Sequence, residues 1–341
     1  MRQRRSGRLA FTLVELMVAM SVLTLIVFVL FKIFDKTQRA MRSNAAQVDV
    51  MEGGRAVMDL LRRDLEQMEA PEGLTTNNVN FYAGLAVRGA SLELPGYDPD
   101  DSSTWPDNLK QNYLDEIYFL RPSRESTSNE VWEATVYRVL ARTNLTPNEL
   151  VYPQYATNYA VEGVGWLARR SFEVPTLKPM DPSEAEPRYL GAPIQDLTHP
   201  LNQALGVRPI DWARFSQVAG GIVHFKVTPL DSRGQPVWQA VGSRDGMMLN
   251  PPDFLAYPGE VAFQPVAGDP ETWRYYFVGE GMPASLQVEL GVLEPQVVGR
   301  LNGLPNARVR AEFLREQAAK IHYFEQRIPL RSASKLLPNK P

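Results

Sequence analysis

The chain has 341 residues, of which 44% are hydrophobic and 22% charged, and its formal net charge is −3 at pH 7. This length suits one large domain or two small ones with a packed core, and the slightly acidic balance argues against nucleic-acid binding, which usually shows a basic domain or stripe. The absence of cysteine excludes disulfides, thiolate zinc sites and a cysteine nucleophile.

The first predicted element is an apolar helix long enough to cross a membrane. The 21 residues from Phe11 to Phe31 contain one charged side chain, that of Glu15. As a helix they span about 31 Å, which matches a hydrocarbon core of about 30 Å. The basic leader MRQRRSGRLA also fits a secretory signal peptide, but the run exceeds the usual apolar region of about 7–15 residues and no clear cleavage site follows it.

The carboxylate of Glu15 is the unusual feature of this helix. A charge inside a membrane segment is costly and indicates a function, although Glu15 lies near enough to the start of the span to reach the interface. The surrounding sequence AFTLVE, residues 10–15, resembles the cleavage and methylation site of type IV prepilins and type II secretion pseudopilins. The family usually has glycine before the cut, where this chain has Ala10.

This resemblance implies processing by a prepilin peptidase. In the family the peptidase removes a short basic leader, methylates the new N-terminal phenylalanine and leaves a glutamate at the fifth mature position. The implied cut lies between Ala10 and Phe11, residues 1–10 form the leader, and Phe11 is N-methylated. In the family the glutamate pairs with the N-terminal amine of an adjacent subunit. The resemblance therefore implies that Glu15 finds its partner on another subunit and sets the register of subunit assembly, because a charge buried in hydrocarbon requires a partner.

The helix is expected to continue to about Met68, with residues 11–34 in the membrane and 35–69 in the periplasm. An apolar stripe at spacings of 3, 4 or 7 supports it: Met51, Met58, Leu61, Leu65 and Met68. Arg62, Arg63, Asp64 and Glu66 are expected mainly off this stripe. Gly53-Gly54 predicts either a hinge or a helix end and restart. The segment GGRAVMDLLRRDLEQ resembles the corresponding helix end of J-type minor pseudopilins and W-type minor pilins.

Residues 70–341 are predicted to form an antiparallel sheet domain, which makes the fold class α+β and pilin-like. Four stretches read as strands: 116–122, 131–141, 220–231 and 282–295, the first two as a hairpin. The last two also resemble the sheet of J-type pseudopilins. Residues 171–213 hold seven prolines and 249–272 hold five, so both are interpreted as loop insertions. A C-terminal helix is expected over residues 306–324, capped by Asn306.

The sequence offers little chemistry outside the helix. His199, His224 and His322 match no metal-ligand spacing and are interpreted as structural, in a loop, a strand and a helix respectively. The acidic stretch around Asp98, Asp100 and Asp101 is a weak candidate calcium site, because hard cations prefer such oxygen ligands. No other cofactor or metal and no catalytic residue is predicted, and the expected role is non-enzymatic.

The resemblance implies a minor subunit of a type II secretion pseudopilus that primes or tips the filament. With the four arginines of the leader removed, the mature charge would be −3 − 4 = −7. Glu15 argues against the K-type tip subunit and favours a J-type or W-type one. The expected partners are the prepilin peptidase, other pseudopilins or pilins, the inner-membrane assembly platform and membrane lipid, with no nucleic acid.

The implied location is the bacterial inner membrane, with one span and the C-terminal domain in the periplasm. Two alternatives stay open. One is a minor pilin of a type IV pilus for adhesion or DNA uptake. The other is a membrane-tethered periplasmic ligand-binding or enzyme domain, which a deep pocket with convergent titratable groups would favour.

Overall fold

The computed structural model describes residues 12–70, 79–88, 92–93, 109–122, 132–142, 150–151, 164–174, 215–237, 261–266, 269–279 and 281–330. It divides into two compact units, Met1–Asp49 and Val50–Pro341. Helix α1 (Leu13–Leu65) supplies the described part of the first unit and the first element of the second. The class is therefore α+β, with a long apolar N-terminal helix and a sheet-rich domain.

The last part of α1 belongs to the core of the sheet domain. Its buried side chains recur at helical spacing and continue into the turn that follows: Val50, Val57, Met58, Leu61, Leu65 and Met68. The helix ends at Leu65, close to the predicted end, and its chain passes on through a turn at Glu66–Gln67.

Of the two alternatives predicted at Gly53-Gly54, the helix end and restart is wrong, because α1 continues through both residues. A Cβ on Gly54 would overlap the ring of Phe324, whereas a Cβ on Gly53 would meet nothing within 4 Å. Gly54 is thus a place of close packing between α1 and the strand that carries Phe324, and no hinge is needed to explain it.

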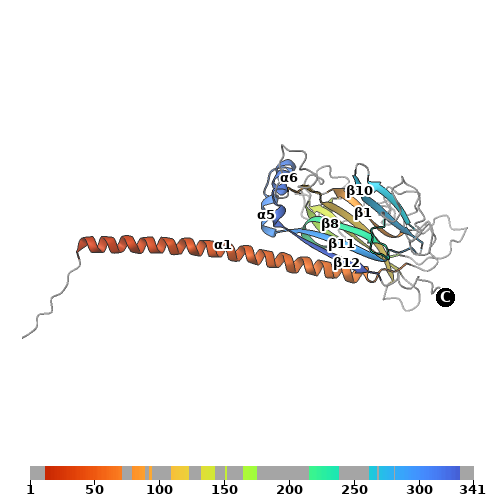
Figure 1. The fold of residues 1–341 in the computed structure, drawn as a ribbon, viewed down its shortest axis with the longest axis horizontal. Helices are drawn as coiled ribbons and strands as arrows, with labels where there is room; N and C mark the ends of the chain where they lie inside the picture. Colours follow the sequence, from red (N-terminus) through yellow and green to blue (C-terminus); the bar gives the residue numbers. More distant parts are fainter. Residues whose placement is uncertain are drawn as a thin grey trace, which may run out of the picture. The chain divides into compact units, whose positions relative to one another are not determined.

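One ten-stranded sheet dominates the second unit (Figure 1). Its main path runs β12-β11-β8-β7-β5-β4-β1-β10-β9, all antiparallel, and β6 pairs with β5. A single parallel bridge, Leu114 to Phe225, also joins β4 to β8. The path strands are β1 (Val79–Arg88), β4 (Tyr113–Pro122), β5 (Trp132–Arg142), β7 (Gly165–Val174), β8 (Ser216–Leu230), β9 (Val261–Val266), β10 (Asp269–Val278), β11 (Ser285–Leu293) and β12 (Ile321–Pro329). The short strands are β6 (Leu150–Val151), β2 (Leu92–Glu93) and β3 (Leu109–Lys110), and the last two pair with each other.

The four predicted strands are confirmed as β4, β5, β8 and β11, and β4 pairs with β5 as the hairpin prediction requires. The two insertions were predicted as loops, but the residues of them that the structure describes lie in strands. The first overlaps β7, which continues to Val174, and the second contains β9 and the start of β10. Two of the prolines lie within strands: Pro265 in β9 and Pro270 in β10. The rest of both insertions lies outside the described residues.

The helix predicted over residues 306–324 is confirmed only over its first half. Asn306 does cap a helix, since its side chain accepts a hydrogen bond from the Val309 N–H, but α6 (Ala307–Arg315) is short. A 3₁₀ turn follows at Ala318–Lys320, and the chain then enters β12. His322 therefore lies in a strand, because β12 pairs with β11 along its whole length.

Helices α5 (Pro295–Asn302) and α6 lie next to each other (Figure 1). Their buried side chains belong to a second, smaller apolar cluster. Leu293 contributes to this cluster, whereas its neighbour Val292 belongs to the main core under α1. Because successive side chains of a strand point to opposite faces, α1 and the α5–α6 pair cover opposite faces of the sheet domain.

Candidate functional site

The first candidate site is the apolar half of α1. Every side chain from Thr12 to Met41 is exposed in the structure, including large apolar ones such as Leu23 and Phe31. This helix is long and apolar enough to span a membrane. Exposed apolar surfaces of this size mark sites of contact with membranes or with other proteins.

Glu15 has a partner within its own chain, which the sequence reading did not foresee. Its Oε2 accepts hydrogen bonds from the backbone N–H and the hydroxyl of Thr12, both at 3.0 Å. The Glu15 N–H in turn donates to the Thr12 hydroxyl at 3.3 Å. This reciprocal arrangement is a capping box, which satisfies N–H groups that the first helical turn leaves unpaired. Glu15 therefore closes the helix end, and its other carboxylate oxygen is not used in these bonds.

The remaining polar side chains of this segment are also satisfied locally. The hydroxyls of Ser21 and Thr24 donate to carbonyls four residues earlier, at 2.9 and 2.8 Å. In hydrocarbon such internal bonds are required, because no water is present to replace them. Charged side chains return at the end of the apolar run. Lys32 lies over the ring of Phe28, and Asp35 pairs with Arg39 at 2.7 Å.

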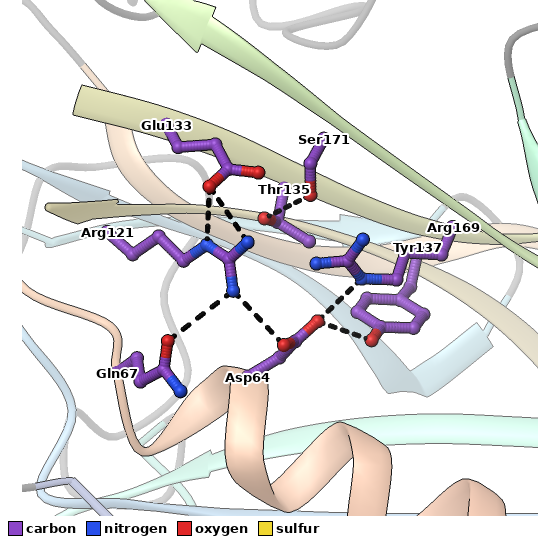
Figure 2. A network of polar contacts seen from close by, with 8 residues as sticks. All are labelled: Asp64, Gln67, Arg121, Glu133, Thr135, Tyr137, Arg169 and Ser171. Carbon is purple, nitrogen blue, oxygen red and sulfur yellow. Dashed lines mark hydrogen bonds and ion pairs between the residues drawn. The ribbon is translucent and has the colours of Figure 1, made fainter. Parts of the chain in front are cut away.

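The second candidate site is a polar cluster between the end of α1 and three strands (Figure 2). Asp64 was expected off the apolar stripe, but its side chain is buried. One carboxylate oxygen, Oδ1, accepts from Arg121 Nη1 at 3.1 Å. The other, Oδ2, accepts from Tyr137 OH at 2.7 Å and from Arg169 Nε at 2.6 Å. One side chain of the helix is thus bound to β4, β5 and β7.

The cluster extends beyond Asp64 through Arg121. Its Nε and Nη2 donate to Glu133 Oε2 at 3.0 and 2.8 Å, and its Nη1 lies 3.5 Å from Gln67 Oε1 (Figure 2). Two carboxylates and two guanidinium groups therefore balance in charge. Burial and the adjacent Asp64 carboxylate raise the pKa of Tyr137 well above its usual value, so its hydroxyl stays protonated and donates. Such a cluster holds elements in register, because a misplaced helix would leave buried charges unpaired.

A signal for this site is present in the sequence. Asp64 lies seven residues after Val57 and three after Leu61, both of which are buried, so helical periodicity places it on the inner face. A charge at such a position predicts a buried partner, but the sequence does not say which basic residues supply it.

Other predicted site residues are distributed as follows. Ala10 and Phe11 lie outside the described residues, as do Asp98, Asp100, Asp101 and His199. His224 lies in β8, where it was predicted, and is buried. Within the described parts of the chain, no group of three or more histidine, aspartate or glutamate side chains is placed to hold a metal ion.

Comparisons with known proteins identify no relative. No known family, curated protein sequence or solved structure matches the chain.

Proposed function

We propose that the chain is a non-enzymatic minor subunit of a type II secretion pseudopilus, which assembles through its N-terminal helix and primes or tips the filament. The observation that supports this most is the division of α1. Its first half is apolar and exposed with one carboxylate near the start, and its last half is built into the core of a sheet domain. The resemblance of residues 10–15 to a prepilin cleavage site points the same way.

In this proposal assembly is the function, and each half of α1 has one task. The exposed half is held in the bacterial inner membrane before assembly and packs among the helices of other subunits afterwards. Glu15 selects the register by meeting the charged amine that cleavage before Phe11 creates on a neighbour. The buried half transmits force from the filament to the periplasmic domain.

The Asp64 cluster supports a mechanical role for the buried half of α1. Its polar contacts all join α1 or the turn after it to the sheet, or join neighbouring strands. Its charged groups bind one another and leave the cluster balanced, so the cluster gives no support to a membrane-tethered enzyme. A pull along the helix is resisted by ion pairs to two strands in addition to apolar packing.

The deciding experiment is the intact mass and N-terminal sequence of the protein recovered from membranes, with and without a prepilin peptidase. We expect a chain that begins at methylated Phe11 when the peptidase is present and retains Met1 when it is absent. A chain that keeps Met1 in both cases would overturn the proposal and favour a tethered domain. A cut beyond residue 31 would indicate a secreted protein.

A further inference from the structure

A second buried polar cluster lies around His224 on the sheet face opposite α1. His224, Gly291 and Tyr323 stand side by side on β8, β11 and β12. A Cβ on Gly291 would lie 2.8 Å from the His224 Cβ and 3.0 Å from the Tyr323 ring. The absence of a side chain at Gly291 lets the two rings meet over it, with centroids 5.8 Å apart. His224 is 2% exposed, so its ring is closed off from solvent.

The contacts of its ring define the protonation state of His224. Its Nδ1 accepts a hydrogen bond from the backbone N–H of Tyr113 at 3.2 Å. Its Nε2 makes no hydrogen bond to the described residues and lies 3.5 Å from Glu289 Oε2, within ion-pair distance when the ring is charged. Only a neutral ring can accept at Nδ1, so the proton of the neutral form sits on Nε2 and faces Glu289.

The Tyr113 amide lies at the start of β4, and residues 109–112 lead into it. Two further contacts hold residues 109–112 against this face of the sheet: Tyr323 OH donates to Asn112 Oδ1 at 3.0 Å, and Lys110 Nζ lies 3.4 Å from the centroid of the Tyr323 ring. The same segment carries β3, which pairs with β2. Glu93 of β2 pairs with Arg315 of α6 at 3.2 Å, so the segment also supports the α5–α6 region.

We propose that His224 is an acid-sensitive latch, whose protonation at Nδ1 removes the acceptor of the Tyr113 amide and loosens the attachment of residues 109–112 to this face of the sheet. An imidazolium has two N–H donors and no acceptor, so the Tyr113 N–H would face a second donor and lose its bond. The charged ring is drawn toward Glu289 instead, which moves it further from Tyr113. A looser segment in turn loosens β2–β3 and its contact with α6.

The charges that face His224 come from every element around it. Glu289 on β11 favours the charged ring, whereas Lys110 on β3 and Lys226 on β8 oppose it. Tyr113 and Tyr323 flank the ring, and burial raises the pKa of Tyr323, so its hydroxyl stays neutral. Burial lowers the pKa of Lys110, and the carboxylates of Glu289 and Glu325 oppose this effect.

Burial outweighs Glu289 and lowers the pKa of His224 below its ordinary value of about 6.5. At pH 7 the ring is therefore neutral and the latch is closed. As pH falls below about 6.5, the unfolded or released chain binds a proton that the closed form resists. The closed form therefore loses stability as the pH falls below about 6.5, and titration of His224 does not destabilise it as the pH rises above 7.

The test is amide hydrogen exchange of Tyr113 in the full chain, in detergent micelles, between pH 7.5 and 5.0. With ¹⁵N-labelled tyrosine and histidine, NMR reports both the Tyr113 amide and the His224 tautomer. We expect the Nε2–H tautomer at pH 7.5. We also expect protection of the amide to fall about tenfold or more toward pH 5, as befits a buried N–H that loses its acceptor.

Two variants separate the latch from general acid effects. His224→Asn places a carbonyl oxygen near the position of Nδ1 and cannot be protonated, so the fall in Tyr113 protection should disappear. His322→Gln removes the other described histidine of this sheet region and should leave the fall intact. An Nδ1–H tautomer at pH 7.5, or protection in the unaltered chain that stays constant to pH 5, would refute the latch. So would the same fall in the His224→Asn variant.

Discussion

At the scale of single residues, Glu15 combines two roles that can be separated. Its carboxylate caps the helix through Thr12, and its charge is proposed to meet an amine on another subunit. A glutamine keeps an acceptor oxygen for the Thr12 N–H but has no charge, whereas a valine has neither.

We predict that Glu15→Val and Glu15→Gln both insert into the membrane but enter filaments poorly. Membrane fractionation measures insertion, and the amount of protein in sheared or affinity-purified filaments measures incorporation. Normal incorporation of both variants would remove the proposed pairing. Normal incorporation of Glu15→Gln alone would mean that capping, rather than charge, is what assembly requires.

Asp64 makes the ion pairs that join α1 to the sheet. We expect Asp64→Leu to lower the free energy of unfolding by about 3–5 kcal/mol, because two partly buried guanidinium groups lose their carboxylate. Urea denaturation of the full chain in detergent, followed by tryptophan fluorescence, measures the change.

The matched control for Asp64 is an ion pair on the protein surface. Glu312→Gln breaks the exposed pair with Arg308 and should cost no more than about 0.5 kcal/mol. Equal effects of the two substitutions would show that the buried cluster contributes no more than a surface pair.

At the scale of elements, the two adjacent glycines of α1 provide an internal comparison. We predict that Gly53→Ala raises the free energy of unfolding by about 0.5–1 kcal/mol, because alanine is the better helix former and the site is open. Gly54→Ala should lower it by about 1–3 kcal/mol, because the new Cβ collides with Phe324. Thermal and urea melts of both variants test the difference in sign. A gain from both would mean that Phe324 moves aside freely.

Some elements are predicted well from the sequence and others are not. The difference depends on whether an element is determined by residues close along the chain or by contacts with distant ones. The strand β11 alternates cleanly between apolar and polar residues, so its own sequence is sufficient. The start of β12 lies in a stretch after Asn306 whose apolar residues also follow helical spacings, so local sequence allows a helix there. Its pairing with β11, residue by residue from Ile321 to Pro329, makes it a strand instead. Local pattern could not supply that information.

The same limit applies to the candidate sites. The apolar run and Glu15 can be recognised in the sequence because residues close to them along the chain are enough to identify them. Arg121 and Arg169 lie 57 and 105 residues from Asp64 along the chain, so no spacing rule could join them. The latch at His224 likewise depends on Tyr113, which is 111 residues away.

At the scale of the whole molecule, the boundary of the folded domain falls inside a helix. A chain that starts at Val50 keeps all of the buried residues of α1 in the sheet domain, and we predict that it folds as a soluble protein. A chain that starts at Glu66 lacks five buried apolar side chains: Val50, Val57, Met58, Leu61 and Leu65.

At about 1.5–3 kcal/mol for each side chain, this loss matches the whole margin of about 5–15 kcal/mol by which proteins are stable, so the shorter chain should not fold. Circular dichroism and thermal melting of the two fragments measure the outcome. A cooperative transition of equal midpoint in both fragments would show that the helix is dispensable for the domain.

The contact between Gly54 and Phe324 joins the first element of this domain to its last strand. During synthesis the buried stripe of α1 is complete when Leu65 has been added. Phe324 is not added until 324 − 65 = 259 residues later. At about 5–20 residues per second, the ribosome needs about 13–50 s to supply it. For that time α1 can already lie in the membrane while its inner face has no finished sheet to meet. If the exposed part of α1 is a membrane anchor, as proposed, the order of the elements separates anchoring from folding in time, with anchoring first.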